Sequence, residues 1–276
     1  MNTVRSADGT SIAFTKVGQG APLILVDGAL CSRSFGPMPK LAAQLTPHFT
    51  VYTYDRRGRG ASGDTPPYAA DREVDDLEAL AALASTGEGA REGAGETVFV
   101  HGTSSGAALA LEAAKRISAI GKLAVYEPPF IVDGTRTPIP DDYLDELNQL
   151  VVGGRAGDAV KMFMRFVGTP AIFTAVMPFT PVWPKLKAVA PTLPYDITIV
   201  QDHQRGTPFI SADWAAVKIP TLVAAGGKSP EWMTNGTRAL ADALPDAQYR
   251  TLPGQNHMVK PQAIAPALTE FFLTHD

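Results

Sequence analysis

Only one of the 276 residues is a cysteine, Cys31, which excludes a disulfide-stabilised fold and a metal site built from several cysteines. A single thiol forms no disulfide within the chain and supplies no cysteine pattern for a metal site. No HExxH motif or comparable spacing of metal ligands occurs either, so we expect neither a metal ion nor another cofactor. The lack of a disulfide framework fits a reducing compartment, and we expect a cytoplasmic protein.

Long apolar runs and clusters of positive charge are missing as well. The first residues, MNTVRSADGTSIAF, hold no apolar core of the length found in signal peptides, and no stretch approaches the roughly 18–20 residues of a membrane span. The net charge is −4 and no basic stripe occurs, which argues against nucleic acid or an anionic membrane as partner. We therefore expect a small-molecule partner, and both a monomer and a homodimer stay open.

The residues that are present indicate a globular protein in which strands alternate with helices. Apolar residues make up 45% and charged residues 19% of the chain, as in ordinary soluble domains. Apolar runs predict strands at 11–18, 22–28, 49–55, 97–102, 122–128, 221–227 and 248–254. Helical spacing predicts helices at 35–45, 72–85, 105–120, 237–244 and 261–274. Such alternation produces a mostly parallel sheet that helices cover on both faces, so we predict an α/β fold.

Two segments interrupt this alternation. Residues 140–205 carry helical patterns without an intervening strand, and we interpret them as a helical cap inserted into the sheet domain. We place the cap at residues 133–207 and the core domain at residues 1–132 and 208–276. Residues 85–96 are rich in Gly and Glu and have no apolar period, which predicts an exposed loop.

The sequence Gly-Thr-Ser-Ser-Gly, residues 102–106, stands between a predicted strand and a predicted helix. This is the context of a nucleophile elbow, in which small residues let the strand and the helix approach closely. The spacing assigns the nucleophile to Ser104. Ser105 then begins the helix, where its N–H and the positive end of the helix dipole stabilise an oxyanion. An ordinary glycine-rich turn is the alternative interpretation.

A serine nucleophile needs a base, and the chain offers five histidines. In enzymes with this elbow the base comes last in the chain, after the final strand. His257 occupies that place, directly after the strand predicted at 248–254. His101 lies on the strand before the elbow, where a packed histidine is expected, whereas His48 and His203 are predicted on the surface or in loops and His275 lies in the C-terminal tail.

The acid that would orient the histidine is less regular. In most enzymes with such an elbow, the acid comes after the strand that follows the helical segment. Ser229 stands at that place here, and serine does not stabilise an imidazolium as a carboxylate does. Glu127 ends the strand after the nucleophile helix, at the same edge of the sheet, and is our first assignment. Glu231 and Asp133 stay open as alternatives, as does a purely structural role for Glu127.

Two further glycine-containing turns follow predicted strands. Asp27-Gly28-Ala29 ends the strand at 22–28, and Gly28 or Ala29 is expected to supply the second N–H of the oxyanion hole. Residues 58–63 match the G-x-G-x-x-G fingerprint of dinucleotide-binding folds. The following Asp-Thr-Pro-Pro opens no helix that could hold a pyrophosphate, so we reject a dinucleotide site.

Elbow serine Ser104, glutamate Glu127 and late histidine His257 together resemble the α/β-hydrolase superfamily over the whole chain. The resemblance implies the α/β-hydrolase fold, with the helical cap inserted after its sixth strand. It also implies that Asp55-Arg56-Arg57-Gly58-Arg59-Gly60 is the structural loop after the fourth strand. Haloalkane dehalogenases and epoxide hydrolases share the fold but use an aspartate nucleophile, so Ser104 argues against both.

A narrower set of short motifs is similar to the zearalenone lactonases. Asp27-Gly28 at the oxyanion loop, Ser-Ser-Gly at the elbow and Glu127 after the sixth strand are shared, while Thr103 stands where those enzymes carry cysteine. Pro181-Val182-Trp183 is similar to a segment that contacts the substrate in that group. Those enzymes open a macrocyclic lactone fused to a phenol ring, and the resemblance implies an apolar ester or lactone substrate.

The cap segment is rich in aromatic residues and methionine, which suit an apolar and adaptable pocket wall. We assign substrate contacts to Trp183, Met164, Phe179 and Met258, and packing of the cap against the body is the alternative. The function that we predict is cofactor-independent hydrolysis of a carboxylic ester or lactone through an acyl-enzyme. Perhydrolysis, C–C bond cleavage and thioester hydrolysis stay open, and so does a ligand receptor without turnover.

Overall fold

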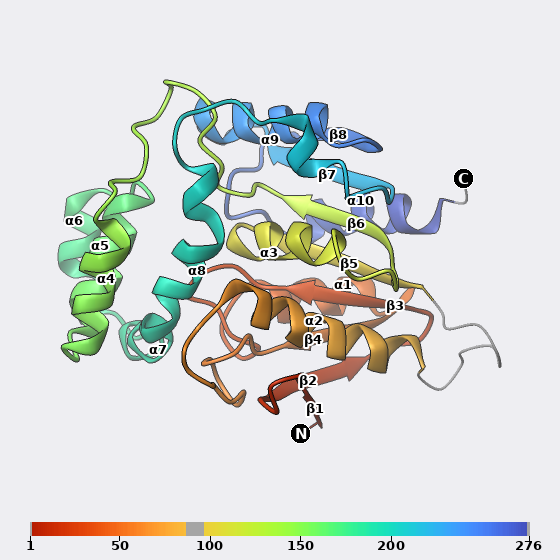
Figure 1. Ribbon diagram of the computed structural model, residues 1–276, viewed down its shortest axis with the longest axis horizontal. Coiled ribbons are helices and arrows are strands. Elements are labelled where there is room, and N and C mark those ends of the chain that lie inside the picture. Colours follow the sequence, from red (N-terminus) through yellow and green to blue (C-terminus); the bar gives the residue numbers. More distant parts are fainter. Residues whose placement is uncertain (1, 87–96, 275–276) are drawn as a thin grey trace.

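The computed structural model describes residues 2–86 and 97–274, which form a sheet domain and a block of helices beside it (Figure 1). The predicted loop at 85–96 therefore lies almost wholly outside the described residues, and so does His275. Within the described ranges, no helix is long and apolar enough to cross a membrane.

A central sheet of eight strands organises the molecule, in the order β1-β2-β4-β3-β5-β6-β7-β8. The strands are β1 (Asn2–Arg5), β2 (Ser11–Val17), β3 (Ala21–Val26), β4 (Phe49–Tyr54), β5 (Val98–Thr103), β6 (Ile120–Tyr126), β7 (Thr221–Gly226) and β8 (Ala247–Leu252). Strand β1 pairs with β2, and β2 with β4, in antiparallel orientation. All neighbouring pairs from β4 to β8 in this order are parallel. The predicted, mostly parallel sheet is thus confirmed, with β1 as an unpredicted edge strand.

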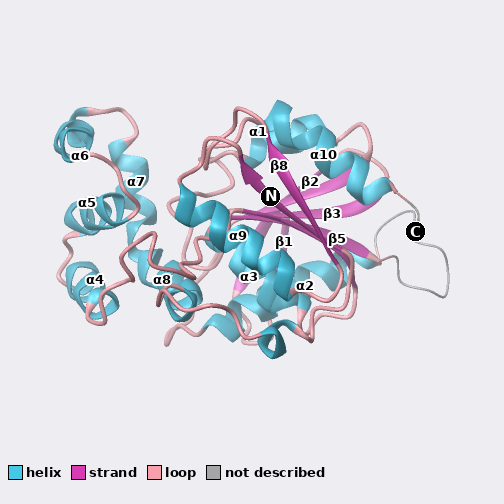
Figure 2. Cartoon of the chain, turned by 90° about the horizontal axis from the view of Figure 1, so that it is seen from above, coloured by secondary structure: helices cyan, strands magenta, loops and turns pink. Residues whose placement is uncertain are grey.

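Helices cover both faces of this sheet, as expected for buried parallel strands. Helices α1 (Met38–Leu45) and α10 (Pro261–Leu273) share one apolar core with the sheet, and α2 (Ala70–Ser85), α3 (Ser105–Ala114) and α9 (Glu231–Ala243) share the other. Figure 2 shows the two groups on opposite sides of the strands. Helix α3 is shorter than predicted because β6 already begins at Ile120, so the chain must turn within residues 115–119.

The helical block lies between β6 and β7 in the sequence. It contains α4 (Tyr143–Val152), α5 (Ala156–Phe166), α6 (Ala171–Val176), α7 (Trp183–Val189) and α8 (Leu193–Val200), with the 3₁₀ turns η1 (Met177–Phe179), η2 (Ala190–Thr192) and η3 (Gln201–His203); η4 (Ser211–Trp214) precedes β7. The insertion of helices after β6 is confirmed, whereas the domain limits at residues 133 and 207 stay a prediction.

The helical block is anchored to the carboxyl edge of the sheet through a core of its own. Buried Leu147, Leu193 and Ile197 from the block share this core with Leu30, which follows β3 in the sheet domain. Helix α8 also packs on α3. In Figure 1 the block stands beyond the ends of β3 and β6, so residues that follow these strands lie between the sheet and the block.

Candidate active site

Ser104 occupies a strained turn between β5 and α3. Its backbone angles are φ 58° and ψ −128°, outside the regions that residues with a side chain normally adopt. Its N–H donates to the carbonyl of Tyr126 at 2.9 Å, so the turn is fixed to the end of the neighbouring strand β6. Strain that the surroundings hold in place is typical of functional sites, and the geometry agrees with the predicted elbow.

The two glycines of the elbow are required by close backbone contacts. A Cβ atom on Gly102 would lie 2.4 Å from the carbonyl oxygen of Gly106. A Cβ atom on Gly106 would lie 2.5 Å from the carbonyl oxygens of Val26 and Asp27, at the end of β3. Any side chain at either position would push α3 away from the sheet, which explains why small residues flank Ser104 at this spacing.

Glu127 and His257 are brought together although 130 residues separate them. The Glu127 carboxylate is fully buried, and its Oε2 lies 2.9 Å from Nδ1 of His257. Its Oε1 accepts the backbone N–H of Gly226 at 2.6 Å. The hydroxyl of Tyr126 donates to the carbonyl of Asn256 at 2.7 Å, which fixes the loop that carries the histidine. The carboxylate thus touches the predicted base and is fixed by a second strand end.

The alternative acids lie in different surroundings. Glu231 is exposed at the first position of α9. Asp133 accepts hydrogen bonds from Thr135 and from Asn235, whose amide nitrogen lies 2.7 Å from it. The place of the commonest superfamily acid holds Ser229, as the sequence indicates, and its hydroxyl is buried. Within the described part of the chain, Glu127 is the one of these three carboxylates that contacts a histidine.

Two of the other histidines, His101 and His203, have packing roles. His101 is buried on β5, where its Nδ1 lies 3.1 Å from the carbonyl of Ala124, and burial lowers its pKa to about 4. The expected packed histidine is therefore neutral near pH 7. His203 belongs to η3 instead of a loop, and its ring contacts Phe130 and Trp214 at centroid distances of 4.8 and 5.1 Å. It is thus part of an aromatic cluster.

The loop after β3 lies directly against Ser104. A Cβ atom on Gly28 would lie 3.0 Å from Cβ and 3.6 Å from Oγ of Ser104, so the Gly28 backbone reaches the nucleophile without a side chain between them. Ser105 is buried at the N-terminus of α3, on the other side of the elbow. Gly28 and Ser105 thus both lie next to Ser104, and the role of Gly28, Ala29 and Ser105 as donors to an oxyanion stays a prediction.

Asp27 belongs to this loop, and the sequence alone does not indicate the protonation state of its carboxyl group. Its side chain is buried, and its Oδ1 has no hydrogen-bond partner among the described residues. Burial raises the pKa of the Asp27 carboxyl to about 8, against the opposing effect of Arg59 and Arg56. The carboxyl is therefore largely protonated and neutral near pH 7, which keeps a negative charge away from the loop beside Ser104.

The four predicted substrate contacts lie in different places. Trp183 is half-buried at the start of α7 and its ring covers Gly157, where a Cβ atom would lie 2.8 Å from the indole. Met164 is partly buried against the core of the helical block. Phe179 is 88% exposed in η1, and Met258 is 78% exposed directly after His257. Substrate contact stays a prediction for all four.

The fold and this arrangement define a class of protein, that of the α/β-fold enzymes with a serine elbow and a late histidine. The pattern that describes the alpha/beta hydrolase family matches residues 20–267, and the chain belongs to this family. An alpha/beta hydrolase from Sphaerobacter thermophilus has a similar crystal structure, with 48% identity and a TM-score of 0.87 over 98% of this chain and 100% of that one.

More distant structures share the fold. The enol-lactonase from Burkholderia xenovorans is 19% identical, with a TM-score of 0.70 over 99% of this chain and 100% of that one. A thermophilic esterase from Thermogutta terrifontis is 20% identical, with a TM-score of 0.66 over 98% of this chain and 97% of that one. The predicted membership of the α/β-hydrolases is confirmed, and the narrower likeness to zearalenone lactonases stays a prediction.

Proposed function

We propose that the chain is a cofactor-independent serine hydrolase of carboxylic esters or lactones. The observation that carries the proposal is the hydrogen bond between the buried Glu127 carboxylate and Nδ1 of His257, at the sheet edge where Ser104 is held in its strained turn. The proposed nucleophile, acid and base follow β5, β6 and β8, in the chain order serine, acid, histidine that this fold uses.

The proposed mechanism follows from the hydrogen-bonding capacity of these groups. A carboxylate only accepts, so Nδ1 of His257 carries the proton toward Glu127 and Nε2 has a free lone pair. Nε2 takes the hydroxyl proton of Ser104 while Oγ attacks the substrate carbonyl. The oxyanion that forms accepts N–H groups from Ser105 and from the loop at Gly28 and Ala29.

Collapse of this intermediate completes the first half of the reaction. His257 returns its proton to the leaving alcohol oxygen, and the acyl group stays on Ser104 as an ester. Water, deprotonated by the same histidine, then attacks the acyl-enzyme and releases the acid. In a lactone both products are one molecule, a hydroxy acid, because the leaving alcohol and the acyl group are joined.

The proposed substrates are apolar or aromatic small molecules. Two observations support this choice: large apolar side chains remain exposed on the helical block, and Met258 lies exposed beside the base. Structural relatives include an enol-lactonase and an esterase. The single Cys31 fits the cytoplasm as the proposed compartment.

The proposal is tested with a panel of aryl esters, small lactones and macrolactones. We expect Ser104→Ala to abolish labelling by a fluorophosphonate and to leave only residual turnover, a loss on the order of 10⁴-fold or more in kcat. Ser229→Ala, which removes a buried hydroxyl at the usual acid position, is the control and should keep normal turnover. Wild-type rates in folded Ser104→Ala protein, or no turnover of any ester or lactone by the wild type, would overturn the proposal.

A further inference from the structure

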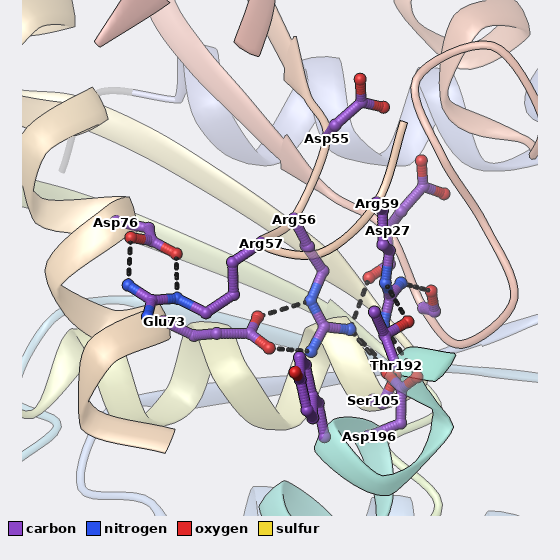
Figure 3. A network of polar contacts seen from close by, with 12 residues as sticks. Asp27, Asp55, Arg56, Arg57, Arg59, Glu73, Asp76, Ser105, Thr192 and Asp196 are labelled. Atoms are coloured by element: carbon purple, nitrogen blue, oxygen red, sulfur yellow. Dashed lines mark hydrogen bonds and ion pairs between the residues drawn. The ribbon is translucent and has the colours of Figure 1, made fainter. Parts of the chain in front are cut away.

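Three arginines of the loop after β4 are buried, and they divide into two groups. The side chains of Arg56, Arg57 and Arg59 are at most 1% exposed. Arg57 pairs with Asp76 at 2.7 Å and with Asp8 at 3.0 Å. Figure 3 shows Arg57 directed toward Asp76, whereas Arg56 and Arg59 converge on a different carboxylate, Asp196.

Arg59 contacts the backbone of the oxyanion loop. Its Nη1 donates to the carbonyl of Gly28 at 2.7 Å and to that of Cys31 at 3.3 Å, while its Nη2 donates to Asp196 at 2.7 Å. Its Nε donates to the hydroxyl of Thr192 at 3.0 Å. Three nitrogens of one rigid, planar group therefore have separate partners, which fixes the guanidinium in the plane that reaches Gly28.

The Gly28 carbonyl belongs to the same peptide group as the N–H of Ala29. A trans peptide is planar, so its C=O and N–H point in opposite directions as one rigid unit. Holding the carbonyl therefore fixes the direction of the Ala29 N–H. The backbone at Gly28 lies against Ser104, whose Oγ would be 3.6 Å from a Cβ atom on Gly28.

From this geometry we infer that Arg59 is the positioning residue of the oxyanion hole and that Ala29 supplies the second N–H. The inference rests on the proposed function, since it assigns a donor to the oxyanion of that reaction. The neighbouring peptide, whose N–H belongs to Gly28, is held less well, because Arg56 Nη1 lies 3.4 Å from the carbonyl of Asp27. A charged donor on the carbonyl also polarises the peptide and strengthens its N–H as a donor.

The backbone beside this peptide needs such support. Leu30 follows with φ 57°, a left-handed conformation that is unfavourable for a leucine. Its side chain is buried in the core of the helical block. The Gly28–Ala29 peptide therefore lies in the chain between two anchored residues, with Arg59 on the Gly28 carbonyl and the Leu30 side chain in that core.

Asp196 joins both halves of the oxyanion hole to the helical block. Its Oδ2 binds Arg59, and its Oδ1 accepts Arg56 Nη1 and the hydroxyl of Ser105, each at 2.7 Å. Ser105 supplies the first N–H of the hole and Arg59 orients the peptide of the second. One carboxylate on α8 thus fixes the residues around both donors, as Figure 3 shows.

The test compares Arg59→Gln with Arg57→Gln, since the two arginines are equally buried in the same loop and both are ion-paired. We expect Arg59→Gln to lower kcat by about 10- to 100-fold with KM within about threefold, because the oxyanion hole acts on the transition state. Affinity for an arylboronic acid, whose Ser104 adduct is tetrahedral, should fall by the same factor as kcat/KM. Arg57→Gln should keep kcat within about threefold of the wild type, even if it lowers the melting temperature as much as Arg59→Gln does.

A second pair of variants decides the question if Arg59→Gln does not fold. Arg59→Lys keeps the buried cation opposite Asp196, but a single ammonium does not replace the fork that binds Asp196 and Gly28 through separate nitrogens. We expect a loss of about 3- to 10-fold in kcat for Arg59→Lys and none for Arg57→Lys.

Equal losses in kcat for the Arg59 and Arg57 variants would overturn the inference. So would Arg59 variants whose kcat/KM falls only through a higher KM. Wild-type kcat in Arg59→Lys would do the same. Fluorophosphonate labelling of Ser104 separates this failure from a failure of the proposed function. Labelling and turnover in the wild type with inactive Ser104→Ala leave the proposed hydrolase intact, whatever the arginine variants show.

Discussion

Replacing Glu127 with glutamine tests the proposed acid through the tautomer of His257. In the wild type both carboxylate oxygens accept: Oε1 binds the N–H of Gly226 at 2.6 Å and Oε2 binds Nδ1 of His257 at 2.9 Å. Glutamine has one oxygen and one NH₂ group. The Gly226 N–H only donates, so the amide oxygen must face Gly226 and the NH₂ group must face the histidine.

This orientation reverses the hydrogen bond to His257. Nδ1 must now accept, so the ring proton moves to Nε2, the atom that has to take the proton of Ser104. In serine proteases of the chymotrypsin type, a base in the wrong tautomer and without its stabilising charge loses about 10⁴-fold in kcat. We expect a loss of about 10²–10⁴-fold for Glu127→Gln, equal to roughly 3–5 kcal/mol in the activation free energy.

The assay is the turnover of an aryl ester by folded, purified variants, with Glu231→Gln as the matched control. Glu231 is exposed on α9, and its variant should change kcat by less than about tenfold. A crippled Glu231→Gln beside a nearly normal Glu127→Gln would place the acid beyond the helical block and refute the argument. Normal rates in both would mean that His257 acts without an acid.

Two further predictions concern the substrate and the pH dependence of stability. Trp183→Ala should lower kcat/KM for bulky aromatic lactones by about tenfold but for acetate esters by about twofold, because its indole acts on binding; equal losses for both substrate types would refute a pocket role. For Asp27, the carboxyl has its ordinary pKa of 3.8 in the unfolded chain, whereas burial raises its pKa to about 8 in the folded protein. The free energy of unfolding therefore falls as pH rises between these two pKa values, by up to roughly 1.4 kcal/mol per pH unit. In urea unfolding, Asp27→Asn should gain on the wild type from about pH 5.5 to 7.5 by this slope, and a constant gap would contradict the buried, protonated carboxyl.

Much of the fold could be predicted because its determinants are local. Continuous apolar runs mark buried parallel strands, and the elbow combines a strand, two glycines and a helix within a short segment. Helix boundaries were less accurate where proline sets the start: α1 begins directly after Pro37 and α9 directly after Pro230. Strand β1 was missed because it is four residues long and mostly exposed, with little apolar pattern.

The site was predictable in part, and what was missed depends on contacts between distant residues. Chain order leads to His257, and the position of Glu127 after β6 makes it the leading candidate. The pairing of Arg59 with Asp196 joins residues 137 positions apart, and no local pattern indicates it. The protonation of Asp27 likewise depends on burial, which only the folded chain creates.

The place of Glu127 also has a consequence for how such a protein can be altered. The proposed nucleophile Ser104 and the proposed acid Glu127 both belong to one continuous segment, β5-α3-β6 and the residue after it, and the helical block begins only after that segment is complete. In proteins whose acid follows β7, the inserted helices lie between the nucleophile and the acid in the chain. Here a different block could be exchanged between β6 and β7 without interrupting that segment, provided that it again offers a carboxylate to Arg56 and Arg59 where Asp196 now stands.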